Sequence, residues 1–117
     1  MRIESQIYGF LYAGLTADGR VKIGISSDPE RRRRQIETAG GVPIVAWESF
    51  TVYAPAACER YVHNRWAAHR GLGEFFNGGK ELFDEVCAYM RPRQSRGDLP
   101  APPQQAEIAH LYADLAA

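Results

Sequence analysis

The chain has 117 residues and a formal net charge of zero, from 14 basic and 14 acidic side chains. This length is typical of one domain of about 100–150 residues. No apolar run approaches the ~18 residues of a membrane-spanning helix, which excludes a transmembrane helical protein. The balanced charge argues against a strongly basic protein that coats nucleic acid nonspecifically.

The N-terminal sequence and the cysteines bear on the cellular compartment. Patterned sequence follows directly after Met1, without the basic and then apolar stretch of a signal peptide. Cys58 and Cys87 both fall in helix-like patterns, which favours free thiols over a disulfide. We therefore expect a cytoplasmic protein that does not associate with a membrane.

The first half of the chain predicts a hairpin, a helix and a third strand. Aromatic and β-branched runs favour strands over residues 7–12, 21–25 and 43–53, with an Asp-Gly turn signal at 18–19. Residues 28–39 predict a helix, because they begin with Asp-Pro-Glu and are followed by two glycines.

The second half of the chain predicts two further helices and a tail. Apolar residues at helical spacing favour helices over about 56–69 and 80–90, separated by a short apolar element at 74–76. Residues 92–105 are rich in proline, arginine and glutamine, which is typical of a linker. Residues 106–117 form a short amphipathic pattern that is marginal as an isolated helix.

The expected fold is a small α/β domain of the α+β type over residues 1–91. It has a three-stranded, mostly antiparallel sheet flanked by helices, followed by the linker 92–105 and the C-terminal tail helix 106–117. This tail helix would dock on its own domain, on a second copy in a homodimer, or on a partner protein.

Several side chains in this order could support phosphodiester hydrolysis. That reaction needs a group that takes a proton from water, a cation at the phosphate and an acidic metal ligand. Tyr12 on the first strand, Arg32 on the first helix and Glu59 on the second helix supply these chemical types. Each type alone is more often structural, because strand tyrosines fill cores and helical glutamates are commonly solvated.

The combination in order resembles the GIY-YIG nuclease superfamily, and in particular its phage-associated branch whose second motif reads Lys-Ile-Gly. The matching segments are Gly9-Phe10-Leu11-Tyr12, Lys22-Ile23-Gly24, Asp28-Pro29-Glu30-Arg31-Arg32, the helix from Ala57 to His63, and Arg70 with Gly73-Glu74-Phe75-Phe76. The first motif departs from Gly-Ile-Tyr. Ungapped spacing from Gly24 selects Leu11 as the tyrosine position, whereas a shared strand face with Tyr8 selects Tyr12, which we assign.

The resemblance implies a one-metal hydrolysis. Mg²⁺ or Mn²⁺ would bind Glu59, and Tyr12 would help to deprotonate the attacking water. Because an ordinary phenol has a pKa near ~10, Tyr12 would need the positive field of Lys22, Arg32 or the metal. Arg32 would hold the scissile phosphate, and His63 would orient water or substrate.

We expect nucleic acid, and DNA in particular, as the partner. Arg31, Arg33, Arg70 and Tyr8 are the candidate nucleic-acid contacts outside the catalytic set. Within the arginine run 31–34, the spacing to Ile36 predicts that Arg32 and Arg33 flank the buried edge, whereas Arg31 and Arg34 point to solvent.

Two alternatives remain at this point. A catalytically inactive fold of the same kind could bind nucleic acid or another protein, and the neutral charge and Lys22 at the second tyrosine position favour it. A zinc site from Cys58, His63, His69 and Cys87 would need a ligand spacing that the chain lacks, since no Cys-x2-Cys pair occurs.

Overall fold

The computed structural model describes residues 8–71, 73 and 75–94 of the chain. Its elements, in chain order, are β1 (Tyr8–Thr16), β2 (Arg20–Ser26), α2 (Pro29–Gly40), β3 (Ile44–Tyr53), α3 (Pro55–Arg65), η1 (Ala67–His69), β4 (Phe75–Asn77), α4 (Gly79–Met90) and η2 (Arg91–Arg93). The tail helix expected at 106–117 lies outside the described residues. So does the expected linker after residue 94.

The strands form one antiparallel sheet in the order β3-β1-β2-β4. The α+β class is therefore confirmed, but the sheet has four strands where the sequence predicted three. The additional strand, β4, comes from the short apolar element, whose Phe75 and Phe76 pair with Lys22 and Val21. Only three residues pair, so periodicity alone could not distinguish this strand from a loop. It covers part of an edge of β2 that would otherwise expose backbone groups.

The start of α2 follows the signals in the sequence. The Asp28 side chain accepts a hydrogen bond from the Arg31 backbone N–H at 3.2 Å. At the other end Gly41 adopts φ 69°, a left-handed conformation that favours glycine. These two signals are local, which is why the sequence predicted both ends of the helix closely.

The second helix, α3, is shorter than predicted. It ends at Arg65, and a 3₁₀ turn replaces the expected continuation to His69. Trp66 leaves helical geometry at φ −111°, its side chain is 4% exposed, and its indole N–H donates to Glu85 on α4 at 3.2 Å. Burial of this large ring against α4 accompanies the departure from the helix.

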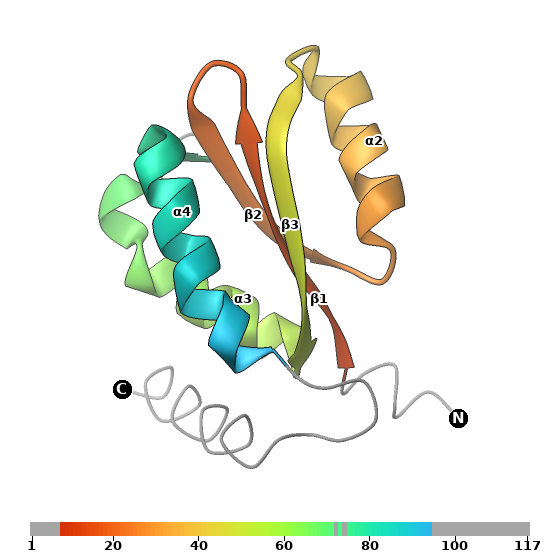
Figure 1. Cartoon of the computed structure of the whole chain (residues 1–117), viewed down its shortest axis with the longest axis vertical. Helices are drawn as coiled ribbons and strands as arrows, with labels where there is room; N and C mark the ends of the chain where they lie inside the picture. Colours follow the sequence, from red (N-terminus) through yellow and green to blue (C-terminus); the bar gives the residue numbers. More distant parts are fainter. Residues whose placement is uncertain (1–7, 72, 74, 95–117) are drawn as a thin grey trace.

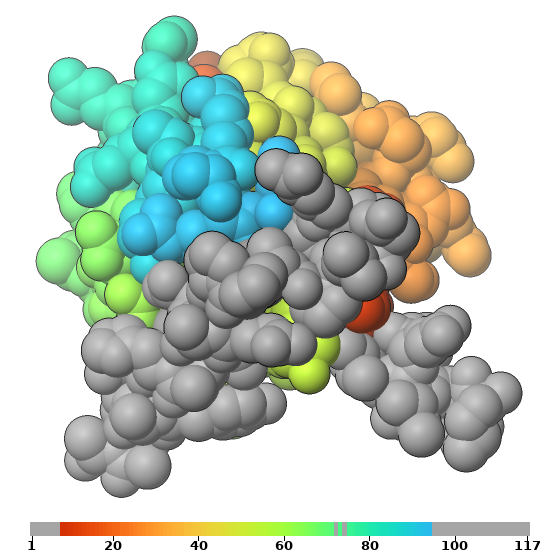
Figure 2. Space-filling view, turned by 60° about the horizontal axis from the view of Figure 1, so that its bottom comes forward, coloured from red at the N-terminus to blue at the C-terminus, as the bar shows by residue number. Residues whose placement is uncertain are grey.

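The helices cover the two faces of the sheet unequally (Figure 1). The main core lies between the sheet and the pair α3 and α4, with Leu11, Phe50 and Phe76 fully buried. On the opposite face α2 covers a smaller cluster of Tyr12, Ile36 and Ile44, with Trp47 packed against it. Figure 2 shows α2 and α4 on opposite flanks, with β3 between them. No helix in the described part of the chain is long and apolar enough to cross a membrane.

Candidate active site on the α2 face

The Tyr12 side chain lies flat on the α2 face of the sheet, directly over Gly24. Tyr12 and Gly24 are paired across β1 and β2, so their Cβ positions point to the same face. A Cβ atom added at Gly24 would lie 2.5 Å from the Tyr12 hydroxyl oxygen. Glycine in the Lys-Ile-Gly motif is therefore required by the ring of Tyr12. Tyr12 is only 1% exposed, so its phenol is enclosed between β2 and the residues of α2 and β3 that pack on it.

Arg32 reaches the same hydroxyl from α2. Its Nε–H donates to the Tyr12 Oη at 3.3 Å, and its Nη1 donates to Gln35 at 3.4 Å. The helix is seated by Ile36, one turn later, which is 8% exposed. Two residues that are 20 positions apart, a strand tyrosine and a helix arginine, are thus brought into direct contact.

Trp47 on β3 holds the other side of the Tyr12 ring. The two rings stack with centroids 4.7 Å apart and an interplanar angle of 17°. Trp47 is paired with Gly14, where an added Cβ would lie 2.8 Å from the indole Cε3. Two glycines therefore let two aromatic rings lie side by side on one face. The sequence did not predict a role for Trp47, because its contact with Tyr12 depends on the β1–β3 register.

The structure separates Leu11 from Tyr12 as the residue that faces this site. Leu11 is fully buried in the main core between the sheet and the α3–α4 pair. Because side chains alternate along a strand, Tyr12 points to the opposite face and meets Arg32. The assignment of Tyr12 over Leu11 as the catalytic tyrosine stays a prediction.

Lys22 lies on the same face of the sheet as Tyr12 and Gly24. It is paired with Gly14 and with Phe75, and only 8% of its surface is exposed. Its Nζ lies 5.0 Å from the centroid of the Phe75 ring. The predicted alternation is confirmed, since Val21 and Ile23 belong to the core on the other face. Lys22 therefore lies two residues along β2 from Gly24, where the Tyr12 phenol packs.

Glu59 and His63 approach β2 from α3. The His63 Nε2 donates to the Ile23 carbonyl oxygen at 3.0 Å, and its ring meets Phe76 edge-on at 5.1 Å. Glu59 lies one helical turn earlier and therefore shares this side of α3. It is half-buried, and none of the hydrogen bonds or ion pairs among residues 8–71, 73 and 75–94 involves its carboxylate. His63 thus anchors α3 to the residue that precedes Gly24.

A match to a family model extends over the whole described domain. The T5orf172 domain model matches residues 8–91, which contain every element from β1 to α4. The chain belongs to the T5orf172 domain family. Membership of this family indicates a nucleic-acid-related role of the nuclease type. Neither the curated proteins nor the solved structures include a significant match to the chain.

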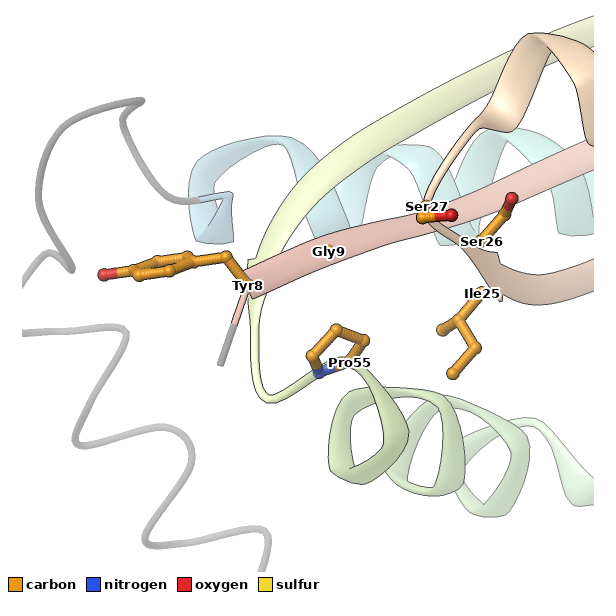
Figure 3. A pocket seen from close by; sticks show the side chains of 6 residues that line it. All are labelled: Tyr8, Gly9, Ile25, Ser26, Ser27 and Pro55. Carbon is orange, nitrogen blue, oxygen red and sulfur yellow. The ribbon is translucent and has the colours of Figure 1, made fainter. Parts of the chain in front are cut away.

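A shallow pocket opens in the T5orf172 domain where β1 begins and β2 ends. It is lined by Tyr8, Gly9, Ile25, Ser26, Ser27 and Pro55. Figure 3 shows Pro55 and Ile25 on one side, while the Tyr8 ring points away from them. An added Cβ at Gly9 would lie 2.7 Å from the Pro55 Cγ, so this glycine lets α3 start close to β1. Since Pro55 begins α3, the pocket lies at the helix end that precedes Glu59.

Tyr8 itself is turned towards β3. Its ring meets Tyr53 edge-on at 5.4 Å, and its hydroxyl is buried without a hydrogen-bond partner among the described residues. Desolvation raises the pKa of the Tyr8 phenol, and the neighbouring Tyr53 raises it further. Tyr8 therefore packs against Tyr53 at the start of β1, four residues before Tyr12.

The arginines that were predicted to contact nucleic acid lie in two places: Arg31 and Arg33 are on α2, and Arg70 follows η1. Arg31 is exposed and Arg32 and Arg33 are half-buried, as the spacing to Ile36 predicted. Arg33 turns towards β3, where its Nη2 donates to the Ile44 carbonyl at 3.4 Å and its Cζ lies 5.9 Å from the Trp47 ring. Arg70 donates from Nε to the Gly73 carbonyl at 3.1 Å, and its Cζ lies 5.5 Å from the Phe76 ring. Glu74, which belongs to the same matching segment as Arg70, lies outside the described residues.

The zinc alternative is not supported by the structure. No three histidine, cysteine or acidic side chains gather as metal ligands in the described ranges. His69 donates from Nδ1 to the Asn77 carbonyl at 3.0 Å, and the Cys58 thiol donates to the Tyr53 carbonyl at 3.3 Å. Burial raises the pKa of the Cys87 thiol to about 12, so this free thiol stays protonated in the core.

Proposed function

We propose that this T5orf172 domain is a GIY-YIG-type endonuclease that hydrolyses phosphodiester bonds in DNA with a divalent metal ion. The observation that carries the proposal is the Tyr12 hydroxyl over Gly24, in hydrogen-bond contact with Arg32. A tyrosine and an arginine in contact on one face of the sheet, with a carboxylate on α3, which packs against β2 from the other face, supply the three chemical types that the reaction needs. The family match supports the nuclease class.

In this proposal Tyr12 first releases its hydroxyl proton to solvent, and the resulting phenolate then takes a proton from the attacking water. The Arg32 guanidinium N–H that donates to this oxygen would stabilise the phenolate. The buried ammonium of Lys22 lies on the same face and adds to this positive field. Arg32 would also hold the scissile phosphate and oppose the charge that develops on it.

Glu59 is the residue proposed to hold the metal. Its carboxylate is half-buried and makes no hydrogen bond or ion pair with another described residue, which fits an oxygen ligand for a hard cation. Bound Mg²⁺ or Mn²⁺ would supply the positive charge that stabilises the leaving oxygen. His63 donates to the Ile23 carbonyl, so we assign it a part in positioning α3 against β2.

The experiment compares wild type with Glu59→Gln on plasmid DNA and on a short RNA. Each protein is incubated with Mg²⁺, with Mn²⁺ and with EDTA, and the rate of strand cleavage is measured. We expect metal-dependent cleavage of DNA by wild type and a loss of about 100-fold or more in Glu59→Gln. Glu81→Gln is the matched control, because Glu81 is exposed on α4 and should leave the rate unchanged.

Three other outcomes would contradict the proposal in different ways. Cleavage that survives Glu59→Gln would remove Glu59 from the site. Cleavage of RNA but not of DNA would mean that RNA, and not DNA, is the substrate. Salt-dependent binding of DNA without cleavage by wild type would favour the inactive binding module, in which the same fold serves recognition alone.

A further inference from the structure

Arg20 extends the α2 face of β2 beyond Lys22. Successive even-numbered residues of a strand share a face, so Arg20, Lys22 and Gly24 form one row. At about 3.3 Å per residue, Arg20 lies about 13 Å along β2 from the position where Tyr12 crosses Gly24. The row therefore leads away from the proposed reaction centre towards the β1–β2 turn.

The fourth strand, β4, pairs with the end of β2 where Arg20 and Lys22 lie. On β2, β4 pairs with Arg20, Val21 and Lys22, and it places Phe75 opposite Lys22. The Arg20 Cζ lies 4.3 Å from the centroid of the Phe75 ring, and the Lys22 Nζ lies 5.0 Å from it. One half-buried ring thus supports two cations.

The hydrogen bonds of Arg20 leave its outer end available. Its Nε donates to both carboxylate oxygens of Asp18, at 3.2 and 3.1 Å, and about 36% of its side chain is exposed. Its Nη1 and Nη2 groups donate no hydrogen bond within the described residues. Other arginines spend their terminal N–H groups inside the domain, as Arg91 does on Glu48 and Arg33 on the Ile44 carbonyl.

We infer that Arg20, oriented by Asp18 and Phe75, binds a backbone phosphate of the nucleic acid that flanks the scissile one. A guanidinium presents paired, coplanar N–H groups that match phosphate oxygens, and the ring beneath it restricts its motion. The inference rests on the proposed function, because it assumes that the scissile phosphate sits at Tyr12 and Arg32. The inference adds a second phosphate contact at Arg20, at the end of β2 that leads away from the scissile phosphate.

The test measures how binding of a DNA duplex and of a single strand depends on salt. Fluorescence anisotropy in the Glu59→Gln background gives Kd over a range of salt concentrations, without cleavage. We expect Arg20→Ala to weaken binding about tenfold at low salt. It should also reduce the slope of log Kd against log salt by about one, since one phosphate contact is lost.

Arg65→Ala is the matched control. Its guanidinium lies at the same 4.3 Å from a ring, that of Tyr89, but on the α3–α4 side of the molecule. It should leave both Kd and slope unchanged. A second variant, Asp18→Asn, removes the carboxylate charge and keeps the Arg20 guanidinium. It should retain the slope, whereas a loss equal to that of Arg20→Ala would show that Arg20 merely braces the turn and would overturn the inference.

The two proposals fail separately. Wild-type cleavage that requires Glu59, combined with an unchanged slope in Arg20→Ala, would overturn the phosphate contact and leave the nuclease function standing. Binding that loses one unit of slope in Arg20→Ala, without cleavage by wild type, would support the contact and overturn hydrolysis. Thermal unfolding of each variant tests whether the fold is intact. An equal loss of affinity in Arg65→Ala would mean that any surface arginine suffices, and would also overturn the inference.

Discussion

The two faces of the sheet are built from the same strands but are packed in different ways. The face under α3 and α4 buries aliphatic and aromatic side chains completely, as at Leu11 and Phe50. The face under α2 combines a tyrosine, a tryptophan and a buried lysine with two glycines that make room for the rings. Hydrophobic burial stabilises the first face, whereas the second holds polar groups at defined positions under α2.

The largest effect expected from this comparison is on the core face. Phe50→Ala removes a side chain with no exposed surface and leaves a cavity, which costs about 3–5 kcal/mol of unfolding free energy. Urea unfolding followed by circular dichroism would measure it. A loss below about 1 kcal/mol would contradict the assignment of this face as the main source of stability.

Tyr12→Phe tests the opposite face, with an effect on activity instead of stability. It removes the hydroxyl that contacts Arg32 and keeps the ring stacked on Trp47. We expect the cleavage rate to fall about 100-fold or more, while the free energy of unfolding changes by about 1 kcal/mol or less. Cleavage at the wild-type rate would exclude the phenol as the proton acceptor. Tyr61→Phe, on α3, is the control.

Gly24→Ala sharpens the comparison by adding a single methyl group beneath Tyr12. The new Cβ would approach the phenol oxygen to 2.5 Å, so the ring must move from Arg32. We expect a cost of about 1–3 kcal/mol in stability, together with a lower cleavage rate. Gly40→Ala is the matched control, because nothing lies within 4 Å of an added Cβ there. Equal behaviour of the two variants would contradict the steric role of Gly24.

The smallest effect concerns the partly exposed ion pair between Arg91 and Glu48. Arg91 donates to both oxygens of Glu48 at 2.8 and 2.7 Å, and these hydrogen bonds lower the pKa of Glu48 below its ordinary 4.5. The stabilisation is therefore complete above pH 4.5 and is lost as pH falls through the lowered pKa. Because the pair is partly exposed, Glu48→Gln should cost at most about 1 kcal/mol at pH 7.

Melting curves of wild type and Glu48→Gln between pH 3 and 7 would measure this contribution. The difference between the two proteins should be largest near neutral pH and should vanish at the acid end. A difference that grows towards acid pH would reverse the sign and contradict the lowered pKa.

Local signals in the sequence predicted most of the fold. The Asp28-Pro29 start and the glycine at 41 defined α2, and the Asp-Gly turn defined the hairpin. Two features escaped prediction because they depend on distant contacts. β4 is a strand only because β2 offers it an edge, and α3 ends at Arg65 where Trp66 packs against α4.

The candidate site shows the same division between local pattern and distant contact. The residue types at Tyr12, Lys22, Arg32 and Glu59 were evident from their order along the chain. The contacts of Trp47 with Tyr12, and of Arg20 with Phe75, require strand registers that no short pattern contains.

The sequence by itself determined the order of the main elements, the faces of the first two strands and the chemical types available for a reaction. These properties follow from the period of two in strands, from helix caps and from turn residues, which act over a few positions. Only the tertiary structure decided that Tyr12 meets Arg32 over Gly24, and that His63 ties α3 to the same stretch of β2. Those contacts join residues 20 and 40 positions apart, and packing of the whole sheet against its helices sets the distances between them.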